Sequence, residues 1–284
     1  MQLYIEYFSN HLLAASIMVA VFALLVGSFL NVVIHRLPVM MQREWDIEIT
    51  GEKPIDSYNL FTPHSQCPQC QHVIRWYENI PIISYVLILV GNCSQCKTPI
   101  SPRYPIVEAL SALISVPIVY SFGFNTITFY ALVFSWVLIV LTFIDLEHFL
   151  LPDKLTLPLL WMGLLLNTFD TFTSLEEAVY GAVAGYLALW TVYWVFKLIT
   201  GKEGMGYGDF KLLAALGAWM GITALPLIIL LSSISGIAIA ILLALFNKQS
   251  FDKPIPFGPY LTIAGFISLL WGPQIIQLYL NAIL

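Results

Sequence analysis

Four cysteines stand in two pairs with the spacing of a metal site. Cys67 and Cys70 lie in "CPQC", Cys93 and Cys96 lie in "CSQC", and 22 residues separate the two pairs. Two C-x2-C pairs can supply four thiolates to a tetrahedral Zn²⁺ ion. Because four sulfur ligands leave no open coordination position, the spacing predicts a structural zinc rather than a catalytic one. The alternative is a pair of redox dithiols, or four thiols without a shared role.

Three carboxylates fall inside or at the ends of apolar runs: Glu108, Asp145 and Asp209. Charged groups are expensive in a bilayer, so each is a candidate functional residue. Asp145 ends one apolar run and Asp209 begins another on the same side, which predicts the same depth for both. Two neighbouring carboxylates tend to share one proton, so that one can activate a water while the other polarises a carbonyl. This is aspartic-protease chemistry, and a proton relay is the equal alternative.

Two further carboxylates, Glu147 and Asp153, flank the first aspartate in "IDLEHFLLPD". Either could be the functional group, although a solvated charge in a loop is the ordinary outcome, and Asp153 could simply cap the helix that follows. For Glu108, an ion pair with Arg75 or Arg103 and a role in substrate binding are equally good interpretations.

Composition identifies the class of protein that must position these residues. Of the 284 residues, 59% are hydrophobic and 10% are charged, whereas soluble domains carry about 25% charged residues. Apolar runs of roughly 17–25 residues predict membrane-spanning helices. We expect an all-α polytopic membrane protein with about eight transmembrane helices, near residues 12–34, 106–123, 128–146, 155–170, 177–197, 209–222, 225–246 and 257–280.

One long polar interval divides the chain and contains all four cysteines. The predicted organisation is a first transmembrane helix at 1–34, a small cytoplasmic zinc-ribbon-like domain at 35–105, and a seven-helix membrane domain at 106–284 that carries both aspartates. No Lys or Arg precedes the first apolar run, so we expect a retained helix rather than a cleaved signal peptide.

Basic residues predict the orientation. If the N-terminus lies outside, all 12 Lys and Arg fall on the cytoplasmic side or at its boundary, as the positive-inside rule requires. The cysteines and both aspartates then face the cytoplasm, where thiols stay reduced. The net charge of −5 gives no argument for nucleic-acid binding. No basic residue then lies on the outer side, whose charged residues are Glu6, Asp170, Glu176 and Glu177.

Several ordered motifs resemble one family. "GYGD" at 206–209 matches the GxGD signature of intramembrane aspartic proteases, and "GMGYGDFKLLAALGAWMG" is similar to the form found in bacterial type IV prepilin peptidases. The other landmarks of that family lie on either side of it and span about residues 27–261. Besides the cysteine pairs, they are "GSFLNVVIHRLP" (27–38), "WYENIPIISY" (76–85), "RYPIVE" (103–108), "IDLEHFLLPD" (144–153) and "IPFGPYL" (255–261).

The resemblance implies a bifunctional enzyme of the bacterial inner membrane. Such enzymes cut the basic leader from type IV prepilins and type II secretion pseudopilins at the cytoplasmic membrane face. They then methylate the new terminal amine with S-adenosylmethionine. Carried over by motif position, the catalytic pair is Asp145 and Asp209, which decides against Glu147 and Asp153. The cysteine pairs correspond to the zinc site of the family's cytoplasmic domain.

Other residues have less defined roles. Gly206 and Gly208 would keep the backbone irregular, so that a substrate can approach the second aspartate, and Glu108 is a candidate substrate-binding residue. The chain has no G-x-G-x-x-G fingerprint of a soluble methyltransferase. We expect "GSFLN", with Asn31 and Arg36, and the cytoplasmic domain to contribute to methyl transfer.

An acidic run in the polar interval would suit a basic leader, although a solvated surface is the interpretation we prefer. It comprises Glu44, Asp46, Glu48, Glu52 and Asp56.

Two alternatives remain at this point. One is a peptidase without methyl transfer, which the cysteine-bearing insert disfavours. The other is a proton-coupled transporter with a zinc-ribbon domain, for which the sequence offers no inverted repeat. The sequence leaves open which pilins are processed and the oligomeric state.

Overall fold

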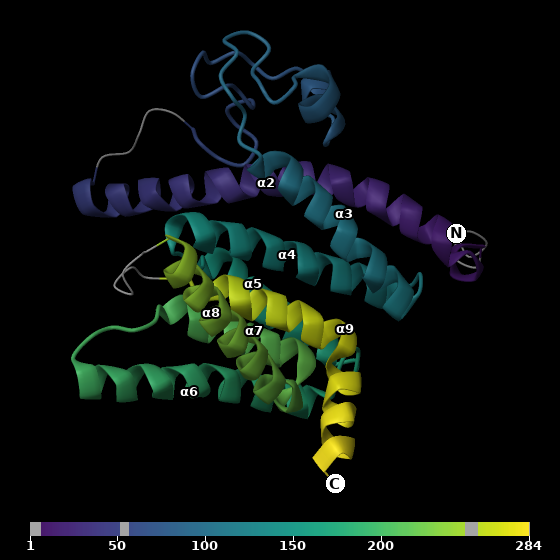
Figure 1. Ribbon diagram of the computed structural model, residues 1–284, viewed down its shortest axis with the longest axis vertical. Helices are drawn as coiled ribbons and strands as arrows, with labels where there is room; N and C mark the ends of the chain where they lie inside the picture. Colours follow the sequence, from purple (N-terminus) through teal and green to yellow (C-terminus); the bar gives the residue numbers. More distant parts are fainter. Residues whose placement is uncertain (1–6, 52–56, 248–254, 284) are drawn as a thin grey trace. The chain divides into compact units, whose positions relative to one another are not determined.

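The structure is a computed structural model that describes residues 7–51, 57–247 and 255–283 (Figure 1). All eight predicted apolar segments are helical, which confirms the all-α fold class. Within the described ranges, the only strand-like pairing is two isolated β-bridges, Gln66 with Val73 and Asn92 with Pro99. The long helices are α2 (Leu12–Thr50), α3 (Arg103–Phe122), α4 (Thr126–His148), α5 (Asp153–Asn167), α6 (Leu175–Thr200), α7 (Tyr207–Met220), α8 (Leu225–Asn247) and α9 (Gly258–Ile283).

Among the described residues, six helices are long and apolar enough to cross a membrane: α2, α3, α4, α6, α8 and α9, the α8 segment starting at Ile222. The other two, α5 and α7, contain 15 and 14 residues. At 1.5 Å per residue they extend only about 21–23 Å, short of a hydrocarbon core of about 30 Å. Neither helix is long enough to cross such a core by itself, and both begin close to a predicted catalytic aspartate.

Helix α2 continues well past residue 34, where its apolar run stops. It extends over 39 residues to Thr50 and ends at Gly51, whose φ of 73° is the left-handed conformation of a helix C-cap. The predicted boundary at 34/35 therefore falls inside a helix, because hydropathy reports where the bilayer ends and not where helical hydrogen bonding ends. Three residues of the acidic run, Glu44, Asp46 and Glu48, lie on this extension, while Glu52 and Asp56 lie outside the described residues.

The chain forms two compact units, Met1–Val140 and Leu141–Leu284. In the first unit, α2 and α3 pack closely at Gly27. A Cβ on Gly27 would lie 2.7 Å from the Cα of Glu108 and 2.9 Å from the Oγ of Ser111. One helical turn further on, the Asn31 side chain donates to the backbone carbonyl of Tyr104 at 3.0 Å. The "GSFLN" motif thus brings two helix backbones together and then joins them through a hydrogen bond.

In the second unit, α7 is the central helix and packs against α5, α6, α8 and α9. Every residue from Asp209 to Trp219 is buried except Lys211. Glycines allow this close packing between α6 and α7. A Cβ on Gly181 of α6 would collide with the carbonyl oxygen of Gly217 of α7, and a Cβ on Gly217 would collide with the carbonyl oxygen of Gly181. Small residues of this kind let helix backbones approach in a membrane, where no hydrophobic effect drives helices together.

We expect Gly181→Ala to destabilise the second unit by about 1–3 kcal/mol, the usual range for overpacking. The new methyl group would collide with backbone of α7, which cannot move aside as a flexible side chain can. Thermal unfolding of the purified protein in detergent measures the effect. Gly236→Ala is the matched control, because its Cβ would meet the Tyr260 ring at an ordinary 3.4 Å. Equal melting temperatures for the two variants would contradict the packing argument.

Candidate active site and metal site

Asp145 lies in the last turn of α4 and is 5% exposed. The backbone N–H of Gly258 donates to its Oδ2 at 3.0 Å. Gly258 is the first residue of α9, and the first N–H groups of a helix have no partner within the helix. A Cβ at this position would lie only 2.6 Å from the same carboxylate oxygen. The start of α9 therefore reaches Asp145 so closely only because residue 258 is a glycine.

Asp209 lies in the first turn of α7 and is 7% exposed. Its backbone N–H donates to the carbonyl of Gly206 at 3.2 Å. A carboxylate in the first turn interacts favourably with the positive end of the helix dipole. Both predicted aspartates are therefore buried carboxylates, and each is associated with a helix N-terminus.

A single side chain, Leu151, connects the surroundings of the two aspartates. A Cβ on Gly208, next to Asp209, would lie 2.7 Å from the Cβ of Leu151, and a Cβ on Gly258 would lie 3.1 Å from its Cδ2. In addition, the two carboxylates are close enough to interact electrostatically. The structure thus brings together the two aspartates that the sequence paired.

The flanking carboxylates are in different surroundings. Glu147 is exposed. The side chain of Asp153 is 52% exposed and pairs with the Nζ of Lys211 at 2.7 Å. Exposed ion pairs contribute little energy and do not alter carboxylate chemistry in the way that burial does. Of the three carboxylates near the end of α4, only Asp145 is both buried and next to Asp209.

The two glycines of the GxGD motif have separate roles. Gly206 lies beside the second aspartate, since its Cβ would be 3.6 Å from the Oδ2 of Asp209. Gly208 packs against Leu151 of the chain itself, and a part for either glycine in substrate approach stays a prediction. Hydropathy and spacing could not reveal this packing, because the neighbour of Gly208 is 57 residues away in the sequence.

The four cysteines form one cluster, in which all four sulfur atoms lie within 4.8 Å of one another. The Sγ atoms of Cys67 and Cys96 are 3.7 Å apart, and those of Cys70 and Cys93 are 3.8 Å apart. Tetrahedral coordination at a Zn–S distance of about 2.3 Å requires sulfur atoms about 3.8 Å apart. The cluster therefore has the dimensions of a four-thiolate metal site.

The two cysteine pairs share one backbone conformation. The N–H of Cys67 donates to the carbonyl of His72, and the N–H of Cys93 donates to that of Thr98, each at 2.9 Å. In both loops the residue after the second cysteine has a positive φ, 58° at Gln71 and 59° at Lys97. Two equivalent knuckles each present two sulfur atoms to the same point.

The electrostatics of the thiols also favour a bound cation. Hydrogen bonds from the backbone of Cys70 and Gln69 lower the pKa of Cys67, and those from the hydroxyl and backbone of Thr98 lower the pKa of Cys96 to about 6. The backbone of His72 acts in the same direction on Cys70, but desolvation and the neighbouring thiols raise its pKa to about 11. A bound divalent cation would stabilise all four sulfur atoms as thiolates and remove the repulsion among them.

The remaining predicted residues hold the first unit together. Asn31 donates to the carbonyls of Gly27 and Tyr104. Glu108 is 8% exposed and accepts a hydrogen bond from the N–H of Ile82 at 2.8 Å.

Arg36 is buried beside the segment that leads to the first knuckle. Its guanidinium donates to the carbonyls of Asn59 at 2.9 Å and Pro63 at 2.6 Å. It holds this segment against α2.

The sequence analysis missed one buried carboxylate, Glu78, which is 7% exposed. It lies in the short 3₁₀ helix Trp76–Asn79 and accepts hydrogen bonds from the N–H of Arg75 at 2.9 Å and from His72 at 3.3 Å. Its motif, "WYENIPIISY", was visible in the sequence. No pattern in the sequence indicated that this glutamate is buried.

Comparison with known proteins gives consistent results. A family model described as the bacterial peptidase A24 N-terminal domain matches residues 21–122, and the model of the type IV leader peptidase family matches residues 132–241. No solved structure matches the chain.

Three similar proteins are each named prepilin leader peptidase/N-methyltransferase. The protein from Stutzerimonas stutzeri is 54% identical over 283 residues, which cover 98% of both chains. The one from Aeromonas hydrophila is 56% identical over 271 residues, 93% of both chains. The one from Pseudomonas aeruginosa is 52% identical over 283 residues, 98% of this chain and 97% of the relative.

We expect metal analysis of the purified protein to find about one divalent ion per chain, bound at the four-cysteine cluster. The double variant Cys67→Ser, Cys70→Ser removes two of the four sulfur ligands and should lose the ion. Ser65→Ala, in the same loop but without a sulfur atom, is the control. A metal-free wild-type protein that retains its fold would contradict the assignment.

Proposed function

The chain belongs to the type IV leader peptidase family, and we propose that Asp145 and Asp209 are its catalytic pair. It is a membrane enzyme with the two activities in its relatives' names, cleavage of the prepilin leader and N-methylation. The observation that carries the catalytic assignment is the burial of both carboxylates around Leu151, with one of them bound by the N–H of Gly258.

The geometry supports the following mechanism. Burial and mutual repulsion disfavour two negative charges, so the pair holds one shared proton. The ionised aspartate takes a proton from water, and the resulting hydroxide attacks the carbonyl carbon of the peptide bond. The protonated aspartate donates to the carbonyl oxygen. The C–N bond then breaks as the first aspartate passes the proton it took from water to the amine leaving group. The second aspartate takes back the proton that it gave to the carbonyl oxygen, so the pair again holds one proton. The N–H of Gly258 keeps Asp145 oriented throughout.

We also propose that the catalytic pair lies at the cytoplasmic face of the bacterial inner membrane. This placement rests on the distribution of basic residues and on the two helices α5 and α7, which are too short to cross a hydrocarbon core of about 30 Å. A prepilin with a basic leader in the cytoplasm and an apolar helix in the bilayer presents its cleavage site at that level. The substrates are type IV prepilins, type II secretion pseudopilins, or both.

Zinc is the metal that best fits the four-cysteine cluster. Four sulfur ligands in a closed tetrahedral set are the usual structural zinc site. Few side chains of the surrounding segment are buried, so the ion would replace a hydrophobic core as the source of stability.

The methyl donor is proposed to be S-adenosylmethionine, which supplies an electrophilic methyl group on a sulfonium. The lone pair of the new N-terminal amine forms the N–CH₃ bond while the C–S bond breaks. The electrons of the C–S bond remain on sulfur, which gives S-adenosylhomocysteine. One proton leaves the methylated nitrogen. The relatives named for both activities cover up to 98% of this chain, so the peptidase without methyl transfer and the transporter receive no support. For Asn31 and Arg36, a part in this step stays a prediction.

We expect Asp145→Asn and Asp209→Asn each to reduce cleavage of a prepilin substrate by about 100-fold or more, because neither variant can complete the proton transfers. Electrophoresis of substrate and product measures the rate, and thermal unfolding checks the fold. Glu147→Gln and Asp153→Asn are the matched controls and should retain cleavage within a few-fold. Wild-type rates in either buried variant would overturn the assignment of the pair.

Gly258→Ala should slow cleavage by roughly 10-fold or more, since small displacements of catalytic groups are costly. The added methyl would lie 2.6 Å from the Oδ2 of Asp145 and must displace that carboxylate. The same cleavage assay measures the effect, with Gly236→Ala as the control. Full activity in Gly258→Ala would show that the contact does not position Asp145.

A further inference from the structure

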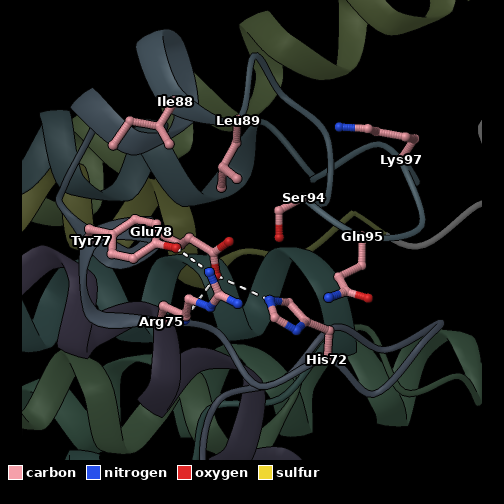
Figure 2. Close-up of a pocket in the computed structure, with 9 residues that line it drawn as sticks. All are labelled: His72, Arg75, Tyr77, Glu78, Ile88, Leu89, Ser94, Gln95 and Lys97. Carbon is pink, nitrogen blue, oxygen red and sulfur yellow. Dashed lines mark hydrogen bonds and ion pairs between the residues drawn. The ribbon is translucent and has the colours of Figure 1, made fainter.

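The cysteine-bearing segment contains a polar cavity of about 300 Å³ that the peptidase chemistry does not use. Figure 2 shows its walls, which come from the 3₁₀ helix Trp76–Asn79, the end of the π-helix Ser84–Ile88 and the loop of the second cysteine knuckle. All these elements belong to the first unit of the chain. The volume is at the lower end of the range for small-molecule sites.

The wall of the cavity carries a carboxylate that is fixed in place. The side chain of Glu78 is 5% exposed, and its Oε2 accepts from the N–H of Arg75 at 2.9 Å and contacts the Nε2 of His72 at 3.3 Å. Ser94, on the opposite loop, also hydrogen-bonds to it, and together these contacts outweigh burial and lower its pKa. The glutamate is therefore an ionised acceptor held at the edge of an open space.

Cationic and apolar groups complete the lining. Arg75 extends across the cavity, donates to the hydroxyl of Tyr77 at 2.6 Å and lies over the Tyr77 ring. Lys97 lies at the far side, and Leu89 points toward Glu78 from above (Figure 2). The cavity thus offers two cations and one buried carboxylate beside an aliphatic surface.

We propose that this cavity binds S-adenosylmethionine, an inference that rests on the methyltransferase function proposed above. The methionyl end of the donor is a zwitterion with an adjacent sulfonium. Arg75 and Lys97 would hold its carboxylate, and the Glu78 carboxylate would accept from its ammonium or ribose hydroxyls. Leu89 and Ile88 offer a surface to the adenine.

The charge pattern discriminates between ligand classes. A nucleoside polyphosphate would place several negative charges beside the fixed Glu78 carboxylate, which opposes binding. A purely cationic ligand would leave Arg75 and Lys97 without an anion. A ligand that carries both a carboxylate and positive charges satisfies all three groups.

The position of the cavity also explains why a metal site would accompany methyl transfer. Ser94 and Gln95 lie between Cys93 and Cys96, Lys97 follows directly, and all three line the cavity. The metal would fix this loop, so that the ligand meets its partners already in position.

Binding of tritium-labelled S-adenosylmethionine to the full-length protein in detergent tests the proposal. We expect Glu78→Gln and Arg75→Met each to weaken binding by about 10-fold or more, because each removes a charged partner. Leu89→Trp should do the same by filling the space while leaving every polar partner in place. Metal content, measured in parallel, shows whether each variant keeps the folded knuckles.

Arg43→Met is the matched control, since Arg43 also lies over a tyrosine ring, that of Tyr58, but lies outside the cavity. It should bind the donor as the wild type does. Unchanged binding in Arg75→Met and Leu89→Trp with intact metal content would overturn the site, even if Glu78→Gln failed to fold. A wild-type protein that neither binds nor uses the donor would instead refute the methyltransferase function itself.

Discussion

Burying two carboxylates next to each other carries the largest free-energy cost in this molecule, and much of the second unit stabilises that arrangement. An ionised carboxylate away from water requires hydrogen-bond donors or a partner charge. Here the N–H of Gly258 at the start of α9 donates to Asp145, and the dipole of α7 acts on Asp209.

The first unit meets a different constraint. Its polar segment has few buried apolar side chains, so contacts among side chains cannot supply a core of ordinary size. The two cysteine knuckles and the clamp from Arg36 to the backbone at Asn59 and Pro63 take the place of such a core. A segment organised in this way can leave a polar cavity open, because its fold does not depend on filling that space with apolar side chains.

Sequence reasoning succeeded where a single pattern carried the information. Apolar runs located every long helix of the described residues, C-x2-C pairs predicted the four-cysteine cluster, and carboxylates in apolar runs pointed to the buried Asp145 and Asp209. It failed where distant residues decide the outcome. The end of α2 at Thr50 depends on backbone hydrogen bonding beyond the bilayer. Gly208 packs against Leu151, which is far away in the sequence. Glu78 is held by His72 and Ser94. No local sequence pattern implies these contacts.

The two chemistries are separated along the chain. Both aspartates, Leu151 and Gly258 belong to Leu141–Leu284, whereas the cysteines and the polar cavity belong to Met1–Val140. The two family models divide the chain in nearly the same place, at residues 21–122 and 132–241. Peptide hydrolysis needs a buried pair of acids, while methyl transfer needs a pocket for a charged donor. These are opposite demands on polarity and water access. Building each on its own unit lets the buried pair stay shielded while the donor pocket stays open to water.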